Sequence, residues 1–122
     1  MSLGSKLTTF AFLTFSGVCL TSVASHAASF NCRYAKLPAE VAICRDSVLH
    51  QLDQDMSDSF YYLRPQLSGS TLSRLNRTQR SFISRRNACG SNASCLEGAY
   101  NTRIEAICNI AQDNDIECYE TN

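Results

Sequence analysis

The stretch PAEVAICRDSVLHQLDQDMSDSFYYLRP, residues 38–65, decides the fold class. Its apolar side chains recur every three or four residues, which is the spacing of one helix face, and they do not alternate as a strand's do. Pro38 suits a first helical turn, Glu40 lies near the positive end of the helix dipole, and Pro65 ends the pattern. We therefore expect one long helix over residues 38–64. Its apolar positions are Val41, Cys44, Val48, Leu49, Leu52, Met56, Phe60 and Leu63.

A second helix is expected from Thr71 to Ala88, after a polar turn at residues 68–70. Ser70 is the expected N-cap, because its hydroxyl can accept from the first free amides. Gly90 is the expected stop, since glycine readily takes the left-handed conformation that ends helices. The apolar stripe consists of Leu72, Leu75, Phe82 and Ile83.

The third helix is expected to begin at a Ser-x-x-Glu capping box formed by Ser94 and Glu97. Its apolar stripe carries Leu96, Tyr100, Ile104, Ile107 and Ala111. Residues 111–122 form an acidic C-terminal tail. From Gln112 onward it has four acids and no base, and we expect a loop pinned by Cys108 and Cys118.

These three segments predict an all-α fold, a small antiparallel three-helix bundle braced by disulfides. Short connections favour antiparallel neighbours, so the first two helices should form a hairpin that turns near residue 66. Reflection about that point places Asp53 opposite Gln79 and Arg80, and Asp46 opposite Arg86. Gln79 and Arg86 fall on the apolar stripe, where polar groups need partners. We expect Arg86 to meet a carboxylate or helix-end carbonyls, with Asp46 the first candidate.

The first 27 residues read as a signal peptide. Lys6 precedes an almost uncharged apolar run of about fourteen residues, fewer than the roughly 20 that a spanning helix needs. Ser25 and Ala27 supply small residues at −3 and −1, and cleavage is expected after Ala27 or Ala28. A lipid anchor at Cys19 is the alternative, but the residues before it lack the usual pattern. The helical domain is then residues 28–110, exported to the periplasm or secreted.

Removal of residues 1–27 from the 122 leaves 95 residues with net charge −1, one histidine and six cysteines. An even cysteine count in a short exported chain predicts three disulfides. Because each would join a helix end to the adjacent segment, we favour Cys32 with Cys44, Cys89 with Cys95, and Cys108 with Cys118. A Cys44 to Cys89 bridge is the alternative that the hairpin leaves open. There is no CxxC motif, so we expect no metal site.

The residue inventory argues against an enzyme. His50 is the only imidazole after the leader, and no free thiol remains if all six cysteines pair. A nucleophile with an adjacent base is therefore missing. Asp46, Asp53 or Asp55 could be proposed as a glycosidase pair, but a bundle of this size offers little room for a cleft. We expect no catalytic residues and no cofactor.

Charge is segregated between the first two helices. Six arginines, at positions 64, 74, 77, 80, 85 and 86, meet no acid between Asp58 and Glu97. One interpretation is pairing between helices and solvated faces. The other is a partner-binding face made of Arg74, Arg77 and Arg85. Export, and polar faces without interleaved aromatic residues, argue against nucleic acid.

The chain resembles the LprI-like lysozyme inhibitors of the bacterial envelope over about residues 30–107. Its most specific part combines the cysteine spacing with the Gln-Arg…Arg…Cys run. Two departures are Phe82, where the family usually has Trp, and the extra pair Cys108 and Cys118. The matching stretches are Phe30-Asn31-Cys32, Glu40-Val-Ala-Ile-Cys44, Leu49-x-x-Leu52-Asp53, Gln79-Arg80-x-Phe82-Ile83-x-x-Arg86-Asn87-Ala88-Cys89-Gly90, Cys95-Leu96, Tyr100 and Arg103-Ile104.

The resemblance implies an all-helical exported domain that, in at least some relatives, inhibits a peptidoglycan-cleaving lysozyme. The expected partner is thus a lysozyme or another cell-wall hydrolase, occluded by stoichiometric binding. Candidate contacts are the arginine face and the turn at residues 90–94, where Ser91 and Asn92 lie between two cysteines. The alternatives are a non-inhibitory structural or adaptor domain of the envelope, and an immunity protein against a secreted hydrolase.

Overall fold

The computed structural model describes residues 29–120, so the expected signal peptide and its cleavage point lie outside the described residues. The all-α class is confirmed, with no strand between residues 29 and 120. The helices are α1 (Pro38–Arg45), α2 (Ser47–Leu63), α3 (Gly69–Ala88) and α4 (Ala93–Gln112), with one-turn 3₁₀ helices at Cys32–Tyr34 and Arg64–Gln66.

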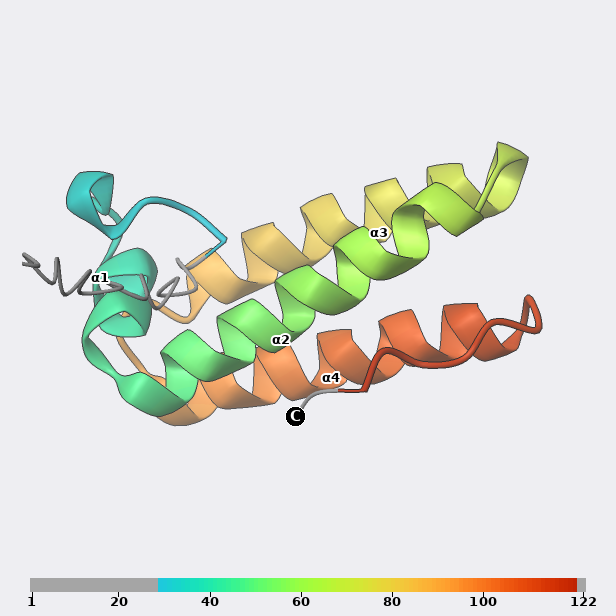
Figure 1. Cartoon of the computed structure of the whole chain (residues 1–122). Coiled ribbons are helices and arrows are strands. Elements are labelled where there is room, and N and C mark those ends of the chain that lie inside the picture. The colour runs from blue at the N-terminus through green and yellow to red at the C-terminus, as the bar shows by residue number, and fades with distance from the viewer. Residues whose placement is uncertain (1–28, 121–122) are drawn as a thin grey trace, which may run out of the picture.

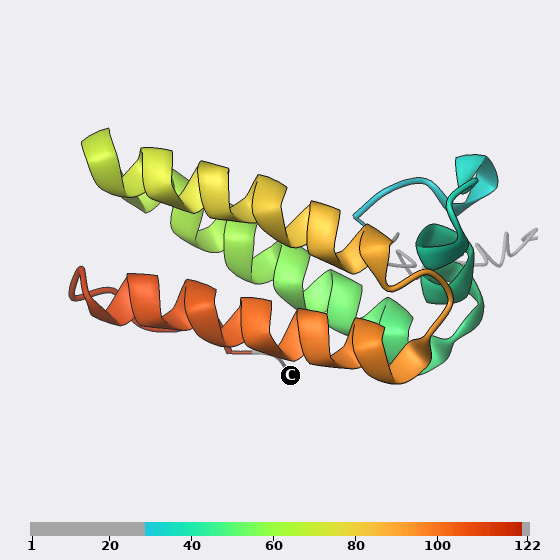
Figure 2. The same ribbon diagram turned by 180° about the vertical axis from the view of Figure 1, so that it is seen from behind.

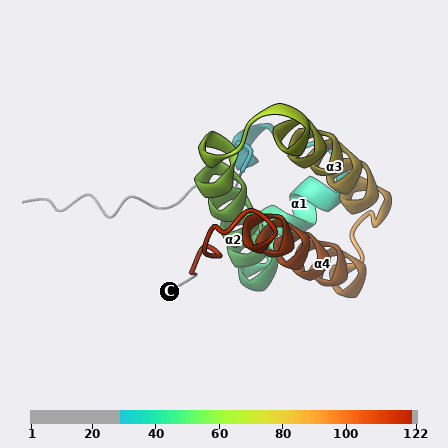
Figure 3. The same ribbon diagram turned by 90° about the vertical axis from the view of Figure 1, so that its right-hand side faces the viewer.

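Three long helices, α2, α3 and α4, lie side by side, and the short helix α1 packs across one end of them (Figures 1 and 2). Consecutive long helices run in opposite directions, as expected. Among the three long helices, α4 contacts both α2 and α3, whereas α2 and α3 approach each other less closely. The end-on view shows the three arranged around a common interior, with α1 at the far end (Figure 3).

The expected single helix over residues 38–64 is wrong at one residue. Asp46 has an extended conformation, with φ −103° and ψ 120°, and separates α1 from α2. Its Oδ1 accepts hydrogen bonds from the amides of Val48 (2.9 Å) and Leu49 (3.1 Å). Asp46 is therefore the N-cap of α2, where a carboxylate satisfies two free amides at the positive end of the dipole.

The ends of α3 and α4 also differ from expectation. α3 begins at Gly69 with Ser68 at the N-cap position, so Ser70 is inside the helix. Gly90, with φ +57°, follows the end of α3 as expected. α4 begins at Ala93 with Asn92 as its N-cap, two residues before the expected cap at Ser94.

The core lies between the three long helices and α1. Phe82 and Tyr100 are its largest side chains, both fully buried, with ring centroids 5.3 Å apart in an edge-to-face arrangement. Phe82 therefore supplies an aromatic anchor in the core. The other buried apolar residues are Ala39, Ile43, Leu49, Met56, Leu63, Leu67, Leu75, Leu96, Ile107, Ile110 and Ala111.

Three disulfides join Cys32 to Cys44, Cys89 to Cys95, and Cys108 to Cys118, the pairing that the spacing favoured. The Cys44 to Cys89 alternative is not formed. Each bridge closes a short loop and stabilises the fold by about 2–3 kcal/mol in the chain-entropy treatment. Three such bonds indicate a non-reducing environment, as outside the cytosol.

The C-terminal segment is a loop, as expected, but it begins later than residue 111. α4 continues to Gln112, and Ala111 is buried in the core. The chain then turns back, half-buried Ile116 packs against the core, and the ring of Tyr119 lies 5.5 Å from that of Tyr62. The acidic tail is thus attached to the bundle through apolar contacts as well as a disulfide.

Candidate functional site

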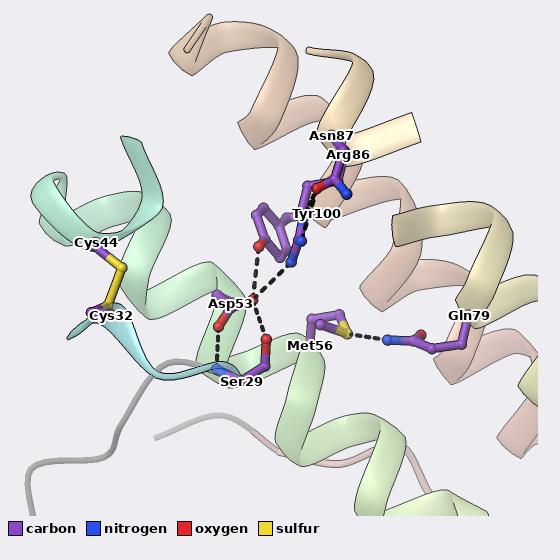
Figure 4. Close-up of polar contacts among 9 residues, drawn as sticks. All are labelled: Ser29, Cys32, Cys44, Asp53, Met56, Gln79, Arg86, Asn87 and Tyr100. Atoms are coloured by element: carbon purple, nitrogen blue, oxygen red, sulfur yellow. Dashed lines mark hydrogen bonds and ion pairs between the residues drawn. A yellow bond between two sulfur atoms is a disulfide. The ribbon is translucent and has the colours of Figure 1, made fainter. Parts of the chain in front are cut away.

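A buried polar network joins α2, α3, α4 and the N-terminal segment around Asp53 (Figure 4). Asp53 has no exposed surface. Its Oδ1 accepts from the Tyr100 hydroxyl (2.7 Å) and the Ser29 hydroxyl (2.8 Å), and its Oδ2 accepts from the Ser29 main-chain nitrogen (2.5 Å). Burial and the neighbouring Asp53 carboxylate raise the pKa of Tyr100 above its ordinary value, so the phenol remains a donor.

Arg86 is the cation of this network, and only 5% of it is exposed. Its Nη1 lies 3.9 Å from Asp53 Oδ1, while Nε and Nη2 donate to Asn87 Oδ1 at 3.1 and 2.9 Å. The guanidinium also lies 5.3 Å from the centre of the Phe30 ring. Arg86 does meet a carboxylate, so its expected structural role fits these contacts.

The expected partner of Arg86, Asp46, is wrong. Asp46 uses its carboxylate to cap α2. A long side chain on a helix leans toward that helix's N-terminus, so Arg86 reaches back along α3 toward the turn and meets Asp53. Reflection of Cα positions does not include this lean.

Gln79 lies in a second polar cluster, between α3 and α4. Its Nε2 donates to Met56 Sδ (3.1 Å), and its Oε1 accepts from Arg103 Nε (2.8 Å). Arg103 also donates through Nη1 to Thr78 Oγ1 (3.0 Å) and through Nη2 to the Leu75 carbonyl (3.3 Å). The expectation that Gln79 needs a partner on the apolar stripe therefore agrees with its contacts.

Arg103 is a buried cation without an acidic partner. It is 2% exposed, and its hydrogen bonds all go to uncharged acceptors. None of the carboxylates in the described range 29–120 lies within 4 Å of it. Burial, and then the nearby charge of Arg85, lower the pKa of Arg103 to about 10. The positive charge at this position is therefore uncompensated.

An open groove of about 390 Å³ runs between α3 and α4 beside this arginine. Arg74, Arg85 and Arg103 all line it. The structure therefore brings together two of the expected binding arginines, Arg74 and Arg85, with Arg103, which was not expected there. The lining acid is Asp113, which lies 3.9 Å from Arg74, with 46% of the arginine side chain and 68% of the acid side chain exposed. Such an exposed pair neutralises little. We call this surface the arginine groove.

The third expected arginine, Arg77, is exposed but does not line the arginine groove. It lines a second open hollow, next to Arg74 and the acidic residue Asp113. Arg74, Arg77 and Arg85 therefore line two hollows that share Arg74 and Asp113, and we call these three arginines the cationic ridge. Arg80 is exposed on the same helix and lines neither hollow.

The turn at residues 90–94 lies at the α1 end of the bundle, closed by the bond between Cys89 and Cys95. Ser91 and Asn92 are both exposed. Asn92 Oδ1 accepts from the Cys95 amide at 2.9 Å, so part of this side chain is committed to capping α4. Ser91 is the freer of the two expected contact residues.

The sequence reasoning missed Arg103 as a member of the site, although a signal was present. Arg103 is seven residues after Leu96, three after Tyr100 and four before Ile107, which places it on the buried stripe of α4. A charged residue at such a position predicts either a buried partner or a functional cation.

The carboxylates considered for catalysis are dispersed. Asp53 is buried within its network, Asp46 caps α2, and Asp55 accepts from Gln51 Nε2 at 2.8 Å. Within residues 29–120, no cluster of three or more His, Cys, Asp or Glu side chains is arranged to hold a metal ion. In the same range, none of the helices combines the length and apolarity needed to cross a membrane.

The chain matches no protein-family model, no curated protein and no solved structure.

Proposed function

We propose that the protein is an exported binding protein that inhibits a peptidoglycan-cleaving lysozyme by occupying its substrate cleft. One observation supports this most directly. The exposed arginines of α3 and the buried Arg103 give one side of a rigid bundle a positive charge that the acid beside them, Asp113, only partly offsets. The resemblance to the LprI-like inhibitors supplies the class of target.

The charge suits the chemistry of that target. A retaining or inverting glycosidase cleft contains two carboxylic residues that must remain available to the sugar. The ridge formed by Arg74, Arg77 and Arg85 is one helix wide, and a helix with its side chains is about 10 Å across. Arginine also forms paired hydrogen bonds with carboxylates. Binding of this ridge would exclude the glycan without chemistry at the inhibitor.

Rigidity favours binding of this kind. The α3 and α4 helices that carry the groove are linked by a turn closed by a disulfide, and the segment that follows α4 is bonded back to that helix through Cys108 and Cys118. A surface that is already ordered loses little conformational entropy on association.

The experiment is a turbidity assay of bacterial lysis by a panel of lysozyme types, with and without the oxidised protein. We expect at least one type to be inhibited at a near-equimolar ratio. Equal lysis across the panel at excess protein would contradict the proposal and favour an adaptor domain. Inhibition of a cell-wall hydrolase other than a lysozyme would favour the immunity protein.

A matched pair of variants locates the surface. Arg85→Glu reverses a charge that lines the groove, whereas Arg80→Glu reverses an exposed charge on the same helix away from it. We expect Arg85→Glu to weaken inhibition and Arg80→Glu to leave it near the parent value. Equal effects would show that the net charge of the protein matters and not the groove.

A further inference from the structure

The main-chain nitrogen of Ser29 lies 2.5 Å from Oδ2 of the buried Asp53 carboxylate, and the Ser29 hydroxyl lies 2.8 Å from Oδ1 (Figure 4). One residue therefore presents two donors to the one buried acid among residues 29–120. Ser29 is also the residue that follows Ala28, one of the two cleavage points expected for the leader.

The position of Ser29 is fixed by its neighbours in the chain. Phe30 packs against the core and lies over the guanidinium of Arg86. Cys32 is bonded to Cys44 on α1. These two anchors hold the chain so that the nitrogen of residue 29, and not that of a later residue, meets the carboxylate.

The negative charge of Asp53 has no cation within short hydrogen-bond distance. The nearest charged group, Arg86 Nη1, is 3.9 Å away, at the far end of the ion-pair range, and Arg86 donates its short hydrogen bonds to Asn87. The short contacts of Asp53 come from the neutral groups of Ser29 and Tyr100. A charged donor in the place of a neutral one forms a hydrogen bond roughly twice as strong.

We propose that the leader is removed by hydrolysis of the bond between Ala28 and Ser29, and that the new α-ammonium of Ser29 then forms an ion pair with Asp53. Water adds across the peptide bond, so Ala28 leaves with a carboxylate and Ser29 keeps the nitrogen as an ammonium. The co-reactant is water, and a signal peptidase of the exporting cell catalyses the step. Ser29 itself is exposed, so the remaining ammonium hydrogens stay hydrated.

This inference rests on the proposed export and is independent of lysozyme inhibition. It selects Ala28 over Ala27 as the last leader residue, which moves the −3 and −1 positions from Ser25 and Ala27 to His26 and Ala28. It also assigns Asp53 a second role, since the carboxylate that pairs with Arg86 becomes the receptor for the processed terminus. Maturation would thereby complete the buried network that joins α2, α3 and α4.

The first test is the terminus itself. The full chain, expressed in a bacterium with its own leader, is purified from the exported fraction in oxidised form, and its intact mass and N-terminal sequence are measured. We expect a chain that starts at Ser29. A chain that starts at Ala28, or at any other residue, overturns the proposal.

The second test measures the ion pair. A variant with one glycine inserted between Ala28 and Ser29, exported in the same way and verified by mass, converts the Ser29 nitrogen into an amide and changes no other side chain. We expect the parent to have a roughly five- to tenfold larger folding equilibrium constant at pH 6–7, because a hydrogen bond to a charged group is the stronger one.

The pH dependence separates the effect of the charge on the Ser29 nitrogen from the effect of the added glycine. An α-amino group ordinarily titrates near about pH 8. Pairing with Asp53 favours its protonated form in the folded state, so the advantage is present below that pH and lost as the pH rises beyond it. The other charged or titratable groups that face this nitrogen are Asp53, Arg86 and Tyr100, and both proteins contain all three. Equal stability of the two proteins at every pH overturns the ion pair.

Discussion

Asp53 on α2 and Arg86 on α3 hold their charged atoms 3.9 Å apart inside the bundle, where 0% of the acid and 5% of the arginine are exposed. A buried pair of this kind is costly to break, because removal of one partner leaves the other charge unpaired in a medium of low dielectric constant. It is much less costly to replace both partners with apolar groups of similar size.

The first prediction follows from this asymmetry. Asp53→Ala should lower the free energy of unfolding by about 3–5 kcal/mol, measured by denaturant titration of the oxidised protein. The double variant Asp53→Leu with Arg86→Met should recover a large part of that loss. Asp58→Ala, an exposed acid on the same helix, is the control, with an expected change within about 0.5 kcal/mol. A double variant less stable than Asp53→Ala would contradict the explanation.

Tyr100 gives a prediction with a defined pH range. Its folded pKa is raised, so the folded state keeps a proton that the unfolded state loses above about pH 10. The contribution of Tyr100 is therefore present below about pH 10 and decreases as the pH rises above it. Tyr100→Phe should lower the free energy of unfolding by about 1–3 kcal/mol at neutral pH, because Asp53 loses a donor. Between pH 9 and 11, the free energy of unfolding of this variant should fall less than that of the parent.

The comparison with Tyr100→Phe is needed because Arg103 acts in the opposite direction. Its pKa is lowered to about 10, so the folded state releases a proton that the unfolded state keeps, and this raises stability as the pH increases. Both proteins contain Arg103, so the difference between their pH curves isolates the phenol. Parallel curves up to pH 11 would show that the phenol titrates alike in the folded and unfolded states.

The sequence predicts the helices and the disulfides well because both depend on residues that are close together in the sequence. Apolar spacing sets which face of each segment is buried, and six cysteines near helix ends leave few short loops to close. The break at Asp46 was missed because apolar residues continue at helical spacing on both sides of it. An N-cap involves a single residue, and one residue does not change the apolar spacing of the whole stretch.

The contacts between helices were harder to predict. The pairing of Asp53 with Arg86 depends on how far an arginine leans along its helix, which reflection of positions cannot give. The arginine groove depends on the approach of α4 to α3, which brings Arg103 beside Arg74 and Arg85. These residues come from two helices, so no single stretch of sequence contains the groove.

Asp46 supplies a prediction about the missed break. Asp46→Ala removes the acceptor of the Val48 and Leu49 amides. It should lower the free energy of unfolding by about 1 kcal/mol. Asp46→Asn keeps a capping oxygen and should retain most of that stability. Thermal unfolding followed by circular dichroism measures both. An equal loss in the two variants would mean that the charge of Asp46, and not its cap, is responsible.

The C-terminal disulfide should be needed for the position of the tail. Replacement of both Cys108 and Cys118 with serine opens a loop with a sequence separation of 10 and should cost about 2–3 kcal/mol. The contact between the Tyr119 and Tyr62 rings should also be lost, which nuclear Overhauser effects between them would report. Tyr119→Ala with the disulfide intact separates the ring contact from the cross-link. A double serine variant that keeps both the ring contact and the parental stability would show that apolar packing alone holds the tail.

The last prediction distinguishes the two expected contact surfaces in a lysozyme complex. Reversal of the charges at Arg74, Arg77 and Arg85 should slow association and weaken its dependence on salt, because charges that face a partner steer the encounter of two proteins. Ser91→Trp should instead speed dissociation if the turn enters the cleft, since an exposed bulky ring in a closed loop cannot be accommodated there. Ser91 is the better probe than Asn92, whose side chain caps α4. Association and dissociation rates, measured by surface plasmon resonance at several salt concentrations with an inhibited lysozyme, separate these outcomes. Parental rates for the charge-reversed protein would exclude the arginine face, and parental rates for Ser91→Trp would exclude the turn. Parental rates for both would leave the acidic segment after Cys108 as the remaining candidate surface.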